Sequence, residues 1–312
     1  ARLSNIASDG FIDRASSNLF GYFFNVNYVT EKTLIKAIAF GGKEKTYQAW
    51  YGIEDPEKLR NDRTFNPAGM YFDENGNMQF YDDETDNYAQ NHFQLHWSQK
   101  WSDKWVSNAA LHYTIGKGYF EQYREDETLA DYNLPDFQGN AVSDLVRKRW
   151  LDNDFFGAVF SLNYKTPKTD VMFGGAANRY LGDHFGEVVW TQYYVPAANR
   201  YYNNIGNKDD VNVYAKASQQ FGKLNVFADL QYRMVFYEAT SFRFDDVNDT
   251  FRFFNPKLGL NFDFNDKHSF YGYFGVANKE PRRDDYENGS TKPERLFDYE
   301  LGWKYQSKKV NI

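Results

Sequence analysis

The feature that most restricts how this chain can fold is a strict alternation of apolar and polar residues in segments of strand length. Between Phe20 and Tyr28, for example, every second residue is aromatic or valine. A period of two residues is the signature of a β-strand with one apolar face and one polar face. Because such segments recur along most of the chain, the sequence predicts an all-β protein.

Short polar turns between these segments allow the pairing of neighbouring strands to be tested. Placing Trp101 opposite Trp105 around the turn at 102–104 sets Phe93 opposite Tyr113, and Leu95 opposite Leu111. A sheet with one apolar face and one polar face selects the register that keeps the apolar residues of both strands on the same face. The same test at three further turns predicts these pairs: Val211 with Met234, Phe262 with Phe270, and Leu162 with Val171.

The connections between the predicted strands are alternately short and long. Short turns are expected at 29–32, 102–104, 165–168, 222–223, 265–267 and 307–309, and long loops at 41–89, 117–148, 181–209, 238–251 and 279–295. Short turns at one end and long loops at the other, with strands of about ten residues, are typical of bacterial outer-membrane barrels. We therefore expect about eleven antiparallel strands, with the apolar face toward lipid and the polar face toward a wet lumen.

Composition excludes several other classes of protein. With 42% hydrophobic and 20% aromatic residues the chain can fold, whereas no stretch approaches the roughly 18 apolar residues of a membrane-spanning helix. The absence of cysteine excludes disulfides and thiolate sites, and a net charge of −7 argues against nucleic acid as a partner. No secretory signal opens the chain, which looks cut from something longer. No catalytic or cofactor motif is present, so neither an enzyme nor a cofactor is predicted.

A family resemblance is carried by segments near the two ends of the chain. The segments 278–286, 292–295 and 299–302, which read NKEPRRDDY, KPER and YELG, resemble a late-barrel signature of TonB-dependent outer-membrane receptors, and 8–14 resembles an extracellular-loop stretch of the same barrels. The resemblance implies an antiparallel transmembrane β-barrel of 22 strands around a plug. Residues 1–312 then form a partial barrel domain, about half of the strands, with short periplasmic turns and long extracellular loops but no plug domain.

The resemblance also implies a function and its partners. Members of this family bind a scarce nutrient at the outer membrane and import it, coupled to TonB through an N-terminal region that this sequence lacks. A ferric siderophore or another iron complex is the first expectation for the small-molecule partner, with membrane lipid around the barrel. Uptake of haem, cobalamin or oligosaccharide remains an alternative, and a passive porin, a barrel enzyme or a soluble sandwich is a reading from another class.

Candidate binding residues follow from the polar face of the predicted strands. His92, His96 and His112 fall on that face, where three imidazoles could hold a metal or a haem iron. The alternative is that a polar lumen accepts histidine as readily as glutamine or asparagine.

Arginines and aromatic residues supply the other candidates. Guanidinium groups suit anionic chelates, and the arginines concerned are Arg233, Arg282 and Arg283, with Arg60, Arg63, Arg243 and Arg252 in the loops. Flat ligands could stack on Tyr271 and Tyr273, or on the loop residues Tyr47, Trp50 and Tyr51. Ion pairing and packing against a plug are the alternatives. The acidic runs 73–77 and 82–86 offer calcium ligands or, alternatively, ordinary turn chemistry.

Overall fold

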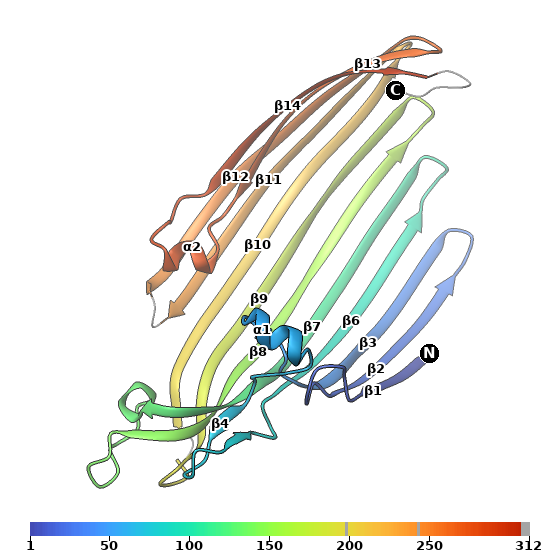
Figure 1. The fold of residues 1–312 in the computed structure, drawn as a ribbon. Helices are drawn as coiled ribbons and strands as arrows, with labels where there is room; N and C mark the ends of the chain where they lie inside the picture. The colour runs from blue at the N-terminus through green and yellow to red at the C-terminus, as the bar shows by residue number, and fades with distance from the viewer. Residues whose placement is uncertain (197–198, 242–243, 307–312) are drawn as a thin grey trace.

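Twelve strands form a single antiparallel sheet in which each strand pairs with the next strand of that sheet along the chain (Figure 1). The computed structural model describes residues 1–196, 199–241 and 244–306. The strands are β1 (Arg2–Ser8), β2 (Ser17–Val29), β3 (Thr33–Tyr47), β6 (Thr85–Lys100), β7 (Trp105–Thr128), β8 (Val142–Lys165), β9 (Thr169–Thr191), β10 (Asn199–Phe221), β11 (Leu224–Ser241), β12 (Phe244–Asn265), β13 (His268–Lys279) and β14 (Glu294–Tyr305). The prediction of an antiparallel all-β chain is confirmed. Within the described residues the sheet is not closed, because β1 and β14 are its two edges, and the predicted turn at 307–309 lies outside those residues.

The strand register agrees with the sequence-based pairing at three of the four hairpins tested. Phe93 pairs with Tyr113, Val211 with Met234, and Phe262 with Phe270. At the fourth hairpin the prediction was wrong by two residues.

In that hairpin Leu162 pairs with Phe173 instead of Val171. The turn runs from Thr166 to Thr169, where the Thr166 hydroxyl accepts hydrogen bonds from the backbone N–H groups of Lys168 and Thr169 at 3.3 and 3.0 Å. A threonine side chain that caps its own turn in this way moves the closing pair one residue along the chain. A shift of two residues keeps every side chain on its predicted face.

Register partners define an apolar face and a polar face of the sheet. One row of partners across β2, β3, β6, β7 and β8 consists of Phe24, Ala39, Phe93, Tyr113 and Phe156. The row beside it, on the opposite face, consists of Asn25, Ile38, Gln94, His112 and Gly157. The large residues of the first row are exposed, Phe93 at 45% and Phe24 at 46%, so the apolar face has no protein cover.

The strands are much longer than the predicted ten residues. β7 and β8 have 24 residues each, and β9 and β10 have 23. Much of the predicted loops 117–148, 181–209 and 238–251 is therefore strand, and the loop predicted at 41–89 is confined to 48–84. Beyond the apolar stretch the apolar residues no longer alternate strictly with polar ones, as in Leu145-Val146 and Val188-Val189, so the hydrophobic period disappears although the backbone ladder continues.

Short and long connections separate to opposite ends of the sheet, as the sequence predicted. The long-loop end carries α1 (Pro56–Asn61) and the hairpin of β4 (Met70–Phe72) and β5 (Met78–Phe80), all within 48–84 (Figure 1). It also carries a 3₁₀ turn (Leu129–Tyr132) and α2 (Arg283–Glu287). No helix in the described parts of the chain is long and apolar enough to cross a membrane.

Buried apolar residues gather where the long loops fold back onto the sheet. One cluster joins the 3₁₀ turn to β8 and β9, and it consists of Leu129, Tyr132, Leu134, Leu145 and Val188. A second joins α2 to β11 and β12 through Tyr286, Ala239 and Val247. These two clusters fix the loops that surround the candidate site.

Candidate ligand-binding site

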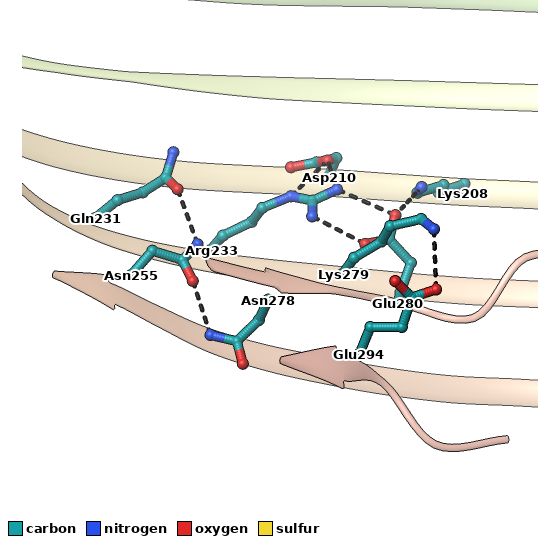
Figure 2. Close-up of polar contacts among 9 residues, drawn as sticks. All are labelled: Lys208, Asp210, Gln231, Arg233, Asn255, Asn278, Lys279, Glu280 and Glu294. Carbon is teal, nitrogen blue, oxygen red and sulfur yellow. Dashed lines mark hydrogen bonds and ion pairs between the residues drawn. The ribbon is translucent and has the colours of Figure 1, made fainter. Parts of the chain in front are cut away.

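An ion-pair cluster lies on the polar face where β10, β11 and β13 approach the long-loop end (Figure 2). Arg233 of β11 donates to Asp210 Oδ2 of β10 from Nε and Nη2, at 2.9 and 2.6 Å. It also donates from Nη1 to Glu280 Oε2 at 2.9 Å, and Lys208 pairs with the same carboxylate. Asp210 and Lys208 alternate on β10, so strand periodicity places both on one face.

Glu280 is the centre of this cluster. It follows the last residue of β13, and only 9% of its surface is exposed. Burial alone would raise the pKa of this carboxyl, but hydrogen bonds from Lys208 and Arg233 outweigh burial and lower the pKa to about 2. Glu280 is therefore ionised at neutral pH and holds three strands together at the point where the NKEPRR segment leaves the sheet.

The short helix α2 continues that segment and folds onto the polar face. Asp285 accepts a hydrogen bond from the backbone N–H of Arg282 at 2.7 Å, which closes the first turn. Tyr286 packs beside Tyr237 of β11 at a ring distance of 5.7 Å and donates to Asp249 of β12 at 2.6 Å. These contacts fix α2, and with it Arg283, over β11.

A cavity of about 210 Å³ lies beneath α2 on the polar face. Its lining includes Lys208, Arg283, His184, Tyr180 and Tyr237. The side chains come from β9, β10, β11 and α2, so the cavity exists only when all four elements are in place. Arg283 donates from Nε to Glu287 at 3.0 Å, and Tyr180 donates to Asn153 at 2.6 Å.

The lining suits an anionic oxygen ligand. Two cationic side chains, an imidazole and two phenols line one half-open cavity, and such groups recognise carboxylates and catecholates. The volume is below the 300 Å³ or so of a pocket that encloses a complete small molecule. The cavity therefore fits one anionic arm of a larger ligand.

The predicted arginines fall into different environments. Arg233 and Arg283 lie in the cluster and the cavity just described, joined through Lys208, which belongs to both. Arg282 is two-thirds exposed, with Asp285 at 3.9 Å. Arg60, Arg63 and Arg252 are exposed, and Arg243 lies outside the described residues. Of the six predicted arginines that the structure describes, two thus share Lys208 as a neighbour.

The three predicted histidines each have a separate partner. His92 Nδ1 contacts Thr114 at 2.9 Å, His96 Nε2 contacts Gln94 at 3.0 Å, and His112 Nε2 contacts Asn178 at 2.8 Å. Among residues 1–196, 199–241 and 244–306, no group of three or more histidine, cysteine, aspartate or glutamate side chains is placed to hold a metal ion. The geometry matches the alternative reading, in which the polar face accepts histidine as a hydrogen-bonding residue.

Tyr271 and Tyr273 lie on the polar face of β13, opposite Asn261 and Gly259. Each ring covers a glycine: a Cβ added to Gly302 would meet the Tyr271 ring, and one added to Gly275 would meet Tyr273. Tyrosines that lie over cross-strand or neighbouring glycines fill the space that the missing side chains leave. Neither tyrosine lines the cavity beneath α2.

The predicted loop residues mostly stabilise the loops themselves. Tyr47 is buried and donates to Ala68 O and Tyr81 O, whereas Trp50 and Tyr51 are about half exposed. In the acidic run 73–77, Asp73 accepts backbone hydrogen bonds from Asn75 and Asn77 at 2.9 Å, which is turn chemistry. In the run 82–86, Asp83 pairs with Lys45.

Sequence reasoning missed Lys208, Asp210, His184, Tyr180 and Tyr237. His184 and Lys208 lie in the segment 181–209 that was predicted as loop, and Tyr180, Asp210 and Tyr237 directly border predicted loops. The available signal for a strand was the spacing of Asn204, Gly206, Lys208 and Asp210 at every second position. It carries no hydrophobic period, so the strand there was not detected.

A protein-family model matches most of the chain. A family model described as "TonB dependent receptor-like, beta-barrel" matches residues 38–312. No curated protein sequence matches the chain.

Solved structures share the fold at low sequence identity. The ferric citrate transporter FecA has a TM-score of 0.67 at 9% identity, with 97% of this chain and 43% of that chain covered. The ferric-catecholate import receptor Fiu from E. coli K12 has 0.64 at 13%, covering 95% and 50%. The copper transporter OprC has 0.67 at 11%, covering 95% and 44%. The chain thus spans half or less of the length of these three proteins.

Proposed function

Because the chain belongs to the TonB-dependent receptor β-barrel family, we propose that it is part of an outer-membrane receptor that binds a scarce nutrient and imports it with energy delivered through TonB. In this proposal residues 1–312 contribute a partial barrel domain, with the apolar face toward lipid and the polar face toward the lumen. The uncovered apolar face supports the membrane location, since exposed aromatic rows of this size need an apolar solvent. The role is transport, not catalysis.

The observation that carries the substrate class is the cavity beneath α2. Lys208 and Arg283, which also pair with Glu280 and Glu287, line a half-open cavity on the polar face beside two tyrosines. An anionic iron chelate with carboxylate or catecholate arms fits this lining better than neutral cobalamin or oligosaccharide does. Transport of ferric citrate by FecA and import of ferric catecholates by Fiu agree with this class.

Haem is a weaker candidate. It needs an iron ligand as well as carboxylate partners, and the imidazoles of His92, His96 and His112 are engaged separately. Copper transport, the function of OprC, requires soft or imidazole ligands. In the part of the chain that the structure describes, no group of three or more histidine, cysteine, aspartate or glutamate side chains is placed to hold a metal ion.

Ligand titration of the intact protein with two matched variants tests the proposal. Arg283→Gln removes a cavity cation, and Arg282→Gln removes its exposed neighbour. Loss of a charged hydrogen bond in a buried site weakens binding by roughly 10- to 100-fold. We expect that loss for ferric citrate or a ferric catecholate with Arg283→Gln, and a change below about twofold with Arg282→Gln. Equal behaviour of the two variants, or no binding of either chelate by the unaltered protein, would refute the anionic-chelate assignment.

The size of the intact protein tests the receptor assignment separately. Its mass should exceed 36.7 kDa, the mass of these 312 residues, because a receptor also needs a plug and the remaining strands. Pull-down with the periplasmic part of TonB should then recover the protein. An intact mass of 36.7 kDa, or no recovery with TonB, would contradict the proposal.

A further inference from the structure

A basic groove lies on the apolar side of the sheet, beyond the end of the apolar rows. Register partners in one row across β2, β3, β6 and β7 are Phe20, Lys43, Ala89 and Lys117. The next row toward the long loops, continued onto β8, is Asn18, Lys45, Asn87, Tyr119 and Trp150. Both rows follow the Phe24–Phe93 row at two-residue steps, so they point to the same side as the apolar face and away from the candidate ligand site.

These two rows line an open hollow of about 400 Å³, and Glu44 also belongs to its lining. Ala89 partners Lys43 on one side and Lys117 on the other, and its methyl group leaves space between the two lysines. Two strand spacings separate the lysine backbones by about 10 Å. Tyr119 and Trp150, with ring centroids 4.4 Å apart, form an aromatic wall. The hollow thus combines a cationic floor with an aromatic side.

The lysines are available to a second anion. Lys43 has no carboxylate within ion-pair distance among the described residues. Lys45 and Lys117 pair with Asp83 and Asp152 at 2.9 and 2.6 Å, but both lysine side chains are more than half exposed. Exposed ion pairs contribute little to stability. A phosphate can therefore share or replace these carboxylates.

The position of the groove along β7 matches the headgroup level of a membrane. Trp105 and Trp101 flank the short turn, where an interfacial aromatic belt is expected. Lys117 lies twelve residues further along β7. At about 3.3 Å per residue and a tilt of about 40°, this spacing is about 30 Å along the membrane normal, just beyond an apolar band of about 25 Å.

We propose that this groove binds a phosphate-bearing lipid of the outer leaflet, with the phosphate between Lys43 and Lys117 and the acyl chains along the apolar rows below. The inference rests on the proposed membrane orientation but is separate from nutrient binding, which uses the opposite face. Continuity of the groove with the lipid-facing rows selects a lipid over a soluble anion. The aromatic wall supplies contacts that free phosphate cannot use.

Native mass spectrometry of the intact protein in detergent tests this proposal. The probe is diphosphorylated lipid A, compared with the same lipid after removal of its phosphates and with inorganic phosphate. The variant Lys43→Gln/Lys117→Gln removes two groove cations, and Lys32→Gln/Lys104→Gln removes two lysines at the short-turn end as a matched control. One lysine near an anionic lipid surface corresponds to about a fivefold change in binding, so the double variant should bind about 30-fold more weakly.

The outcomes separate this proposal from the nutrient-binding proposal. We expect the groove variant to lose lipid A binding, the control to retain it, and the dephosphorylated lipid and inorganic phosphate to bind neither protein tightly. Equal affinities of the groove and control variants, or full displacement of lipid A by inorganic phosphate, would overturn the proposal. Ferric chelate binding is measured on the same samples, so a failure of lipid binding with chelate binding intact refutes the lipid groove alone.

Discussion

Replacing Glu280 by glutamine should loosen the long-loop ends of β10, β11 and β13 while leaving the rest of the sheet in place. The carboxylate accepts from Arg233 and pairs with Lys208, and its pKa falls from the ordinary 4.5 to about 2 although burial opposes the change. At about 1.36 kcal/mol per pKa unit, these contacts stabilise the ionised form by about 3 kcal/mol. Arg233 keeps Asp210 as a partner in the variant, so this value is an upper estimate.

Amide hydrogen exchange of the intact protein measures this effect locally. A loss of about 3 kcal/mol corresponds to exchange about 100-fold faster at amides that open with the cluster. The matched control is Glu294→Gln, because Glu294 pairs with the adjacent Lys279 at 3.1 Å but is 67% exposed (Figure 2). An exposed pair of this kind should change exchange less than about threefold.

The effect of Glu280 should depend on pH in one direction. A carboxyl whose folded pKa lies below its unfolded value stabilises fully above about pH 4.5 and loses that contribution as pH falls toward 2. The difference between Glu280→Gln and the unaltered protein should therefore be constant from pH 5 to pH 8. Equal exchange rates for Glu280→Gln and Glu294→Gln, or a difference that disappears between pH 8 and 5, would refute the assignment of Glu280 as the centre of the cluster.

Three further predictions concern other parts of the sheet. Burial raises the pKa of Glu84 to about 7, so the buried carboxyl stabilises the 48–84 loop only while it is protonated. The free energy of opening this loop, measured by amide hydrogen exchange, should therefore fall by up to about 3 kcal/mol as pH rises from 4.5 to 7. Glu84→Gln should abolish this pH dependence. Gly302→Ala should displace the Tyr271 ring and cost about 1 to 3 kcal/mol in urea unfolding, whereas Gly206→Ala, where an added Cβ meets nothing within 4 Å, should cost clearly less, and equal costs would contradict the prediction. The predicted histidines of the polar face are His92, His96 and His112. Replacing all three by glutamine should leave zinc titrations of the intact protein unchanged. A loss of stoichiometric zinc binding would support the metal hypothesis instead.

The registers that could be predicted are those in which apolar residues face each other across a short turn. Phe93 and Tyr113 are such a pair, and a slip of one residue would have moved every apolar side chain to the polar face. The hairpin at Thr166–Thr169 shows the limit of this rule. A slip of two residues preserves both faces, so only the local hydrogen bonds of Thr166 select the observed pairing.

The candidate site was only partly accessible from the sequence. Arg233 and Arg283 were predicted because arginine suits an anionic ligand, and that role stays a prediction. Their surroundings come from distant segments: Glu280 lies 47 residues from Arg233 and 72 from Lys208. The segment that holds Lys208 and Asp210 is polar on both faces. Without a hydrophobic period it reads as loop, although its backbone ladder is continuous from Ile205 to Phe221.

The sequence by itself determined the all-β class, the two faces of the sheet, most of the registers, the separation of short from long connections and the family. All of these follow from a local period of two residues or from contiguous motifs, which need no knowledge of distant contacts. Only the tertiary structure decided how far the strands extend, that Glu280 joins three strands, that α2 closes a cavity over β11, and that each predicted histidine has its own partner. Those features depend on polar side chains from separate strands meeting at hydrogen-bond distance, and such geometry is set by packing across the sheet rather than by any pattern along the chain.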